Sequence, residues 1–180
     1  MRILVIADDE SLISSWEETQ DGVDLVISCG DIADQIILQA AERSDCGQIV
    51  AVKGNHDSAA DFPPPIRDLH LNVVEIGGLK FGGFAGAWKY KPRGNFLFEQ
   101  REVASMLSWF PRVDIFVGHN SPRHVHDRDD DVHLGFDAFN AYIQRTVPQI
   151  FLHGHQHVSA ETVVGGTKVL GTYGTRVVTV

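Results

Sequence analysis

The chain has 180 residues, of which 43% are hydrophobic, and a formal net charge of −9 at pH 7. This length suits a single domain over residues 1–180, and the negative charge argues against electrostatic binding of duplex nucleic acid. The two cysteines form no disulfide framework, and no stretch is apolar enough to span a bilayer, so we expect a cytoplasmic protein with no membrane partner.

Short apolar runs alternate with segments of helical periodicity along the chain. The runs that predict buried strands are residues 3–6, 25–27, 49–52, 113–117 and 150–152. The segments that predict amphipathic helices are residues 11–19, 33–43, 99–110 and 135–146. Because strands and helices alternate in the first half, we expect a mostly parallel sheet there.

Glycine turns join the remaining β-rich pieces. Residues 73–76 and 80–84 flank Gly77-Gly78 and predict a hairpin. Residues 161–164, 168–170 and 176–180 predict further hairpins or a meander. These pieces favour a mixed α/β fold in which two sheets pack face to face and the helices lie outside.

Five polar segments follow the apolar runs. They are Asp8-Asp9-Glu10, Gly30-Asp31, Gly54-Asn55-His56-Asp57, Gly118-His119 and Gly154-His155-Gln156-His157. Since the ends of successive strands meet at one edge of a sheet, these side chains are expected to converge on one polar site. Oxygen and nitrogen donors without a thiolate favour Mn, Fe, Zn or Mg over a structural zinc site.

A pair of metal ions needs a ligand that can bridge them, and a carboxylate has the two oxygens for it. Asp31 is the candidate bridge, Asp8 would hold one metal, and Asn55 and His119 would hold the other. The paired histidines at 155 and 157 would divide between the two ions. Two metal ions about 3.5–4 Å apart can hold a phosphoryl oxygen and lower the pKa of a bridging water.

His56 follows Asn55 directly, and adjacent residues seldom point at the same ion. We therefore expect His56 to bind the phosphate or to donate a proton to the leaving oxygen, with Asp57 orienting its ring. Each segment alone has an ordinary explanation, as a turn, a helix cap or a chance motif. Their joint occurrence after successive strands makes that explanation poor.

These segments resemble the pattern D-x-H, G-D, G-N-H-D/E, G-H and G-H-x-H of the calcineurin-like metallophosphoesterases, and the small bacterial stand-alone members most closely. The resemblance runs over the whole chain and implies a four-layer αββα sandwich. It implies that Asp8, Asp31 and His157 bind the first metal. It also implies that Asp31, Asn55, His119 and His155 bind the second. The implied cofactors are two divalent ions, with Mn²⁺ preferred and Fe, Zn or Mg as alternatives.

One position departs from that pattern, because Glu10 stands where the family usually has histidine. As a ligand of the first metal, direct or through water, Glu10 would tilt selectivity toward Mn or Mg over zinc. Alternatively, its carboxylate lies at the start of a helix, where a negative charge is favoured in any case.

Two further stretches are predicted to border the site. Residues 86–94 combine aromatic and basic side chains that could stack a base or hold a phosphate, or could form a solvated loop in which Trp88 covers the core. Residues 121–133 follow His119 and carry many charges, which would most often form a solvated face. In this second stretch we expect Arg123, His124 and His126 to contact substrate.

Together these features predict a metal-dependent phosphoesterase that hydrolyses phosphodiesters or small phosphorylated compounds with a bridging hydroxide as nucleophile. The expected partner is a small phosphorylated substrate, and the sequence leaves the oligomeric state undetermined. The alternatives are a non-catalytic protein-binding scaffold of the same fold, which only Glu10 suggests, and a hydrolase with one metal.

Overall fold

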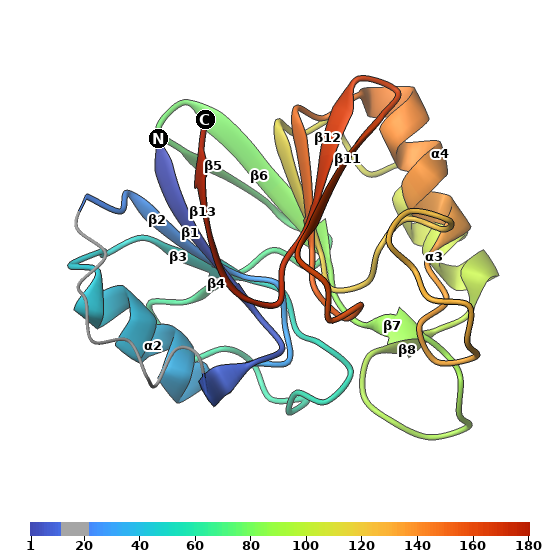
Figure 1. Cartoon of the computed structure of the whole chain (residues 1–180), viewed down its shortest axis with the longest axis horizontal. Coiled ribbons are helices and arrows are strands. Elements are labelled where there is room, and N and C mark those ends of the chain that lie inside the picture. The colour runs from blue at the N-terminus through green and yellow to red at the C-terminus, as the bar shows by residue number, and fades with distance from the viewer. Residues whose placement is uncertain (12–21) are drawn as a thin grey trace.

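A computed structural model describes residues 1–11 and 22–180, so the helix predicted over 11–19 falls almost wholly outside the described residues. One sheet has the strand order β13-β1-β2-β3-β4 (Figure 1). Its strands are β1 (Arg2–Ala7), β2 (Leu25–Ser28), β3 (Ile49–Ala51), β4 (Arg67–Asp68) and β13 (Gly174–Thr179). Strands β1 to β4 pair in parallel, as the alternation of strands and helices predicts, and β13 pairs antiparallel with β1.

The second sheet has the strand order β11-β12-β10-β9-β6-β5. Its strands are β5 (Val73–Ile76), β6 (Leu79–Phe84), β9 (Ile115–Gly118), β10 (Ile150–His153), β11 (Ala160–Val164) and β12 (Thr167–Gly171). The hairpins β5–β6 and β11–β12 confirm two of the predicted glycine turns. A separate two-stranded sheet, β7 (Ala87–Trp88) with β8 (Leu97–Phe98), was not predicted.

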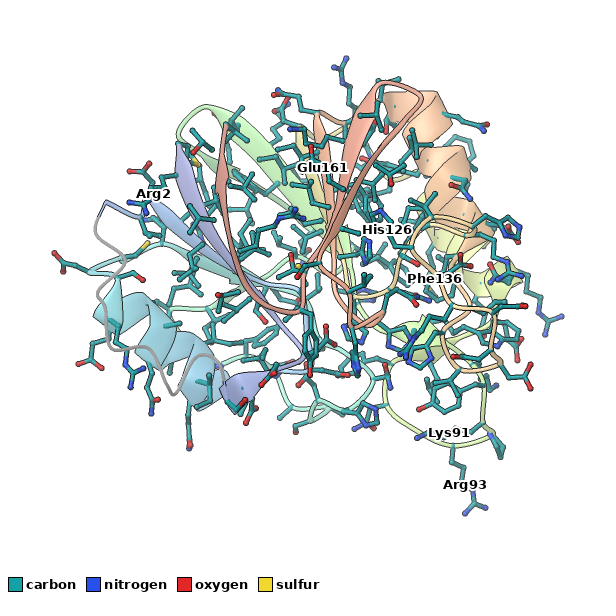
Figure 2. The ribbon with its side chains drawn as sticks, in the orientation of Figure 1. Arg2, Lys91, Arg93, His126, Phe136 and Glu161 are labelled. Atoms are coloured by element: carbon teal, nitrogen blue, oxygen red, sulfur yellow. The ribbon has the colours of Figure 1, made fainter. Side chains whose placement is uncertain are left out.

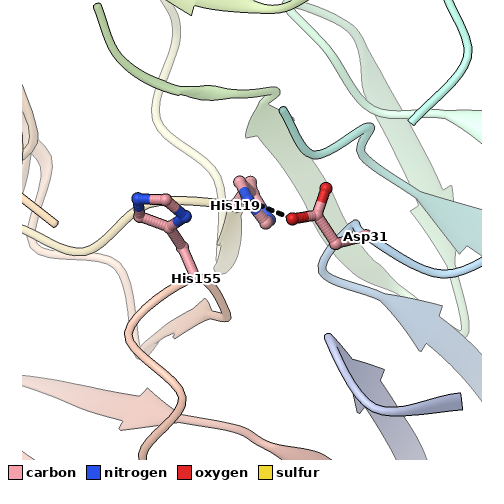
Figure 3. A group of neighbouring side chains, drawn as sticks. All are labelled: Asp31, His119 and His155. Carbon is pink, nitrogen blue, oxygen red and sulfur yellow. Dashed lines mark ion pairs between the residues drawn. The ribbon is translucent and has the colours of Figure 1, made fainter. Parts of the chain in front are cut away.

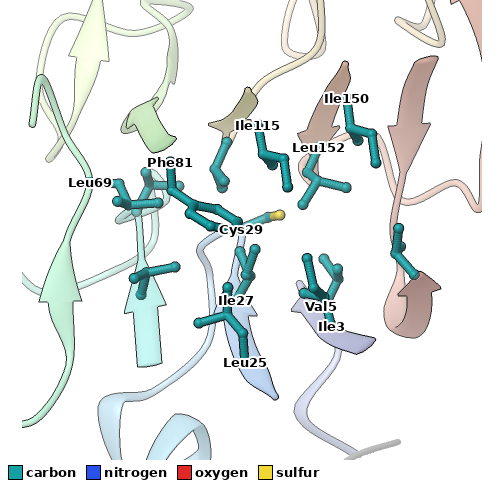
Figure 4. Packing of buried hydrophobic residues seen from close by; sticks show 14 of the residues in the cluster. Ile3, Val5, Leu25, Ile27, Cys29, Leu69, Phe81, Ile115, Ile150 and Leu152 are labelled. Atoms are coloured by element: carbon teal, nitrogen blue, oxygen red, sulfur yellow. The ribbon is translucent and has the colours of Figure 1, made fainter. Parts of the chain in front are cut away.

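Strand alternation divides the apolar side chains between two layers of core. Ile3 and Val5 of β1 point into the core between the sheets, whereas Leu4 and Ile6 pack toward helix α2 (Asp34–Arg43). Figure 4 shows this inter-sheet core, with Phe81 lying between the two sheets. Burial on both faces accounts for the continuous apolar runs of these strands.

The side chains of the second sheet also alternate between the inter-sheet core and a core on the outer face of that sheet. Ile115 and Leu152 enter the inter-sheet core, while Phe116 and Phe151 pack against helices α3 (Gln100–Leu107) and α4 (Asp137–Thr146). Helix α2 covers the outer face of one sheet, and α3 and α4 cover the outer face of the other (Figure 1). The four-layer αββα arrangement is thereby confirmed.

The last strand differs from the predicted meander. After β12 the chain leaves the second sheet, and β13 pairs with β1 in the first sheet. Residues 160–179 therefore contribute strands to both sheets. The Met1 ammonium donates to the carbonyl of Val180, which brings the two ends of the chain together (Figure 1). Within residues 1–11 and 22–180, no helix is both long and apolar enough to cross a membrane.

Candidate metal centre

The loops after β1, β2 and β10 carry strained backbone at the predicted ligands. Asp8, Asp31, His155 and His157 have φ angles of +63°, +54°, +60° and +49°. Residues other than glycine adopt this left-handed region at a cost of about 1–3 kcal/mol when the surroundings impose it. Such strain clusters at functional sites, and four of the predicted metal ligands share it here.

Asp31, His119 and His155 form the centre of the site (Figure 3). One ligand atom of each lies within 4.8 Å of the others. His119 is fully buried, and its Nδ1 lies 2.8 Å from the carbonyl oxygen of Cys29. Because a carbonyl only accepts, Nδ1 carries the proton in the neutral ring, and the lone pair lies on Nε2.

That Nε2 atom faces two further acceptors. Asn55 Oδ1 lies 3.0 Å away, and Asp31 Oδ2 lies 3.5 Å away. The Asn55 amide is oriented by its other end, because Nδ2 donates to the Tyr90 hydroxyl at 3.4 Å. An imidazole lone pair, an amide oxygen and a carboxylate thus meet, and this donor set fits a divalent cation.

Asp8 lies in the next loop, buried beside the second pair of histidines. The backbone N–H of His155 donates to both carboxylate oxygens of Asp8, at 2.9 and 3.1 Å. His157 Nε2 lies 3.9 Å from Asp8 Oδ1, and the side chain of His157 is half exposed. Asp8 and His157 therefore form a second cluster of donors beside the Asp31 centre.

Burial and the charges of neighbouring residues shift the pKa values of three residues at this site. Burial, together with the charge of Asp31, raises the pKa of Asp8 to about 7. Although burial alone would raise the pKa of Asp31, the His119 imidazole holds it well below its usual range. Burial lowers the pKa of His119, but Asp31 outweighs it and raises that pKa to about 9. A bound divalent cation would offset the cost of keeping these carboxylates ionised.

In the loop 154–157, the side chains point alternately toward the site and toward neighbouring segments of the chain. Burial holds the pKa of His155 well below its usual range, and its Nε2 lies 3.3 Å from the carbonyl oxygen of Val132. Gln156 points elsewhere, and its Nε2 donates to Asn120 Oδ1 at 3.0 Å and to the His133 carbonyl at 2.9 Å. Every second residue of this loop thus faces the site.

Glycine is required where the ligand carboxylates pass close to backbone. A Cβ on Gly54 would lie 2.0 Å from Asp31 Oδ1, and one on Gly154 would lie 2.7 Å from Asp8 Oδ2. Any side chain at these positions would displace a ligand. The glycines of the two longest motifs therefore make room for the two carboxylates.

The predicted catalytic pair, His56 and Asp57, divides into an exposed and a structural residue. The His56 side chain is exposed, while its backbone N–H donates to Asp31 Oδ1 at 2.8 Å. Asp57 Oδ2 accepts the backbone N–H groups of Gly54 and Asp31, at 2.7 and 2.9 Å. Asp57 thus joins two motif loops, and these contacts differ from the predicted contact with the His56 ring.

Glu10 takes up the helix contact that was the alternative to metal binding. Its Oε1 accepts the backbone N–H of Ala33 at 2.7 Å, immediately before helix α2. The helix that this contact reaches is α2, at residues 34–43. This geometry favours the structural role.

The three predicted substrate contacts have mainly internal partners. Arg123 donates to Asp127 at 2.9 Å, and both residues line a surface pocket together with His124. His126 lies beside β11, where Nδ1 is 2.9 Å from His153 Nε2 and Nε2 is 2.9 Å from Thr162 Oγ1 (Figure 2). These positions are separate from the cleft described next, so substrate contact by these residues stays a prediction.

Two cavities meet at the candidate metal centre. A cleft of about 250 Å³ is lined by Asp8, Asp31, His56, Val132, His133, His155 and His157. A larger cavity of about 480 Å³ is lined by Glu10, Asp31, Ala33, Asp34, Gln35, Lys53, His56, Asp57 and Ser58. Asp31 and His56 border both. His133 belongs to the stretch 121–133 that was predicted to border the site, but it was not singled out, since isolated histidines in a charged loop carry no motif.

Tyr90 also belongs to this site, through its contact with Asn55. Of the two interpretations of the stretch 86–94, the binding of a base or a phosphate stays a prediction. Trp88 packs against the core beneath α3 and α4, as the loop interpretation predicts. Lys91 and Arg93 lie at the outer tip of the loop between β7 and β8 (Figure 2).

Comparison with known families agrees with the fold and the motifs. The model of the calcineurin-like phosphoesterase superfamily domain matches residues 1–172. The chain belongs to this superfamily. Members of this superfamily generally use divalent metals.

A curated relative is the "Probable metallophosphoesterase MJ0623" of Methanocaldococcus jannaschii, 33% identical over 109 residues. The match covers 60% of this chain and 49% of the relative, so it spans about half of that protein's length. Among solved structures, TT1561 of Thermus thermophilus superposes with a TM-score of 0.63 at 14% identity, covering 96% of this chain and 89% of its own.

A structure described as a novel archaeal phosphodiesterase superposes with a TM-score of 0.50 at 16% identity, over 97% of this chain and 84% of its own. At these identities the two solved structures show the shared fold alone.

Proposed function

We propose that this calcineurin-like phosphoesterase hydrolyses phosphodiesters or small phosphorylated compounds with two divalent cations bound in the 250 Å³ cleft. The observation that carries the proposal is the meeting of His119 Nε2 with Asn55 Oδ1 and Asp31 Oδ2, because a divalent cation that takes the place of the Nε2 proton could bind all three atoms. Asp8 and His157 lie beside this centre and would complete a second site.

The donors would divide between two cations, and Asp31 would serve both. Asp8, Asp31 and His157 would hold the first, and Asp31, Asn55, His119 and His155 would hold the second. When bound, the two cations supply Lewis-acid stabilisation of phosphoryl oxygens and lower the pKa of water in the site. Mn²⁺ is the ion we propose, because the donors combine carboxylate and amide oxygens with imidazole nitrogens and include no thiolate.

His56 is the residue best placed to act on the leaving group. It is exposed and borders both cavities, so a phosphate in the smaller cleft can extend its ester group past His56 into the larger one. A protonated imidazole there would donate its proton to the departing oxygen. Asp31 holds the backbone of His56, and Asp57 fixes the backbone of Asp31, so these carboxylates position the donor.

The substrate that we propose is small. The two cavities total several hundred cubic ångströms and are open to solvent, which suits a phosphorylated small molecule or the end of a larger one. The net charge of −9 disfavours a long polyanion such as duplex nucleic acid.

The test is reconstitution of chelator-treated protein with Mn²⁺, Fe²⁺, Zn²⁺ or Mg²⁺, followed by assays on a chromogenic phosphodiester and the matching monoester. We expect two metals per chain, turnover that chelation abolishes, and loss of turnover in Asp31→Asn. His56→Asn should keep both metals and lose about 10²–10⁴-fold in rate, as for loss of a general acid.

Other results would favour the alternatives. One metal per chain with full activity would indicate a mononuclear hydrolase. Absence of turnover with all four metals would contradict the proposal and favour the scaffold, which should then keep its fold in Asp31→Asn.

A further inference from the structure

The segment 132–134 crosses the cleft at a fixed position, because side chains of two motif loops hold its backbone. Gln156 Nε2 donates to the carbonyl of His133 at 2.9 Å, and Asn120 Nδ2 donates to the carbonyl of Leu134 at 2.8 Å. His155 Nε2 contacts the carbonyl of Val132 at 3.3 Å. Gln156 and Asn120 are buried, so the segment is built into the site rather than resting on it.

The ring of His133 therefore becomes part of the metal cleft. It lines the same cavity as Asp8, Asp31 and His56. Its centroid lies 5.1 Å from that of His155 and 6.0 Å from that of His157. Both of its nitrogens have partners outside the proposed set of metal ligands.

Asp130 fixes the orientation of this ring. Both carboxylate oxygens of Asp130 lie 2.8 Å from His133 Nδ1, and Oδ1 also accepts the backbone N–H of His133 at 2.7 Å. A carboxylate only accepts, so Nδ1 donates and the Nε2 lone pair of the neutral ring is directed elsewhere.

The lone pair on His133 Nε2 has Arg128 as its partner. The guanidinium Nη2 contacts His133 Nε2, and since a guanidinium only donates, the imidazole accepts. The contact uses one of the five N–H donors of Arg128. The positive charge of Arg128 also acts on the site. Burial lowers the pKa of His157, and the charge of Arg128 lowers it further.

We propose that Arg128 binds a non-bridging oxygen of the substrate phosphate, and that His133 and Asp130 are the positioning residues that hold it at the cleft. Among the described residues, the cleft lining includes no lysine or arginine, and Arg128 reaches its rim through the contact with His133. A guanidinium pairs with phosphate through directed N–H donors. This inference rests on the proposed function, since it assigns the residue that recognises the substrate of the same site.

The experiment compares Arg128→Gln with the wild type, both loaded with Mn²⁺. We expect KM for the chromogenic diester, and the inhibition constant of inorganic phosphate, each to rise about tenfold, with kcat within about twofold. Metal stoichiometry and Mn²⁺ affinity should stay unchanged. Arg101→Gln on the outer helix α3 is the matched control and should change none of these values.

His133→Phe tests the positioning role, because it keeps a ring of similar shape and removes the acceptor for Arg128. We expect KM to rise in His133→Phe as it does in Arg128→Gln. The double variant should show no further rise, since the two residues act as one unit. Additive losses would overturn the positioning role. Loss of a metal ion in His133→Phe would show that His133 is a ligand instead.

Binding of inorganic phosphate to the Mn²⁺-loaded protein separates this inference from the proposed function. If the wild type hydrolyses no ester but binds phosphate, weaker binding by Arg128→Gln supports the inference while the proposed function fails. Equal binding by both proteins overturns the inference, whatever the outcome of the hydrolysis assays.

Discussion

Glu10 shows how one carboxylate can serve either a metal or a helix. Its Oε1 accepts the Ala33 N–H at the start of α2, a backbone donor that no helical carbonyl satisfies. In Glu10→Ala we expect two Mn²⁺ per chain, as in the wild type. We also expect the free energy of unfolding to fall by about 1 kcal/mol, as for loss of a helix cap.

Equilibrium unfolding in urea and metal analysis of the isolated protein measure both quantities. Glu10→Gln keeps an acceptor oxygen and serves as the control, so it should be the milder change. Loss of one metal in Glu10→Ala, restored in Glu10→His, would show that Glu10 is a ligand.

Tyr90 acts on the site through Asn55 alone. Its hydroxyl accepts from Asn55 Nδ2 at 3.4 Å, which leaves Oδ1 directed at His119. In Tyr90→Phe the amide loses this orientation, so we expect Mn²⁺ to bind the second site about tenfold more weakly, the lower end of the range for residues that orient ligands. Titration calorimetry with Mn²⁺ measures the loss.

Tyr173→Phe is the matched control for Tyr90→Phe, since the Tyr173 ring lies against His157 on the side of the first metal, 5.2 Å between centroids. It should leave the second site unchanged. Equal affinities in Tyr90→Phe and the wild type would mean that His119 alone orients the Asn55 amide.

At the scale of elements, the loops after the strands depend on glycine to bring the ligands together. In Gly54→Ala the new Cβ would lie 2.0 Å from Asp31 Oδ1 and 2.6 Å from the Asp31 backbone nitrogen. Because Asp31 is the shared ligand, we expect both cations to be lost and the free energy of unfolding to fall by about 1–3 kcal/mol.

Gly47 offers the control for this element, since a Cβ there meets no atom within 4 Å. Gly47→Ala should keep the metals and the stability of the wild type. Full metal occupancy in Gly54→Ala would show that the loop after β2 can move away, and that the close approach is not required.

On the scale of the whole molecule, the proposed cations connect two sheets. Asp8, Asp31 and Asn55 follow strands of one sheet, and His119, His155 and His157 follow strands of the other. Mn²⁺ at 100 times its dissociation constant should therefore stabilise the fold by about 2.7 kcal/mol for each site that it fills, which raises Tm by roughly 5–10 °C per site for a domain of this size.

Calorimetric scans with and without Mn²⁺ measure that shift, and Asp31→Asn should abolish it. A single transition is expected in each scan, because both sheets share the core around Phe81 and Leu152. Two separate transitions would contradict the prediction that residues 1–180 form one domain.

Most of the strands, the packing of two sheets and the order of the candidate ligands can be predicted from the sequence, because burial on both faces and polar loop ends leave local patterns in it. The sequence could not determine which acceptor faces which donor. The helix contact of Glu10, the Tyr90 hydroxyl and the Arg128–His133 pair each join residues separated in the chain, and only packing brings them together. For the same reason the place of β13 in the first sheet was decided by tertiary structure, since an apolar strand can pair with any open edge.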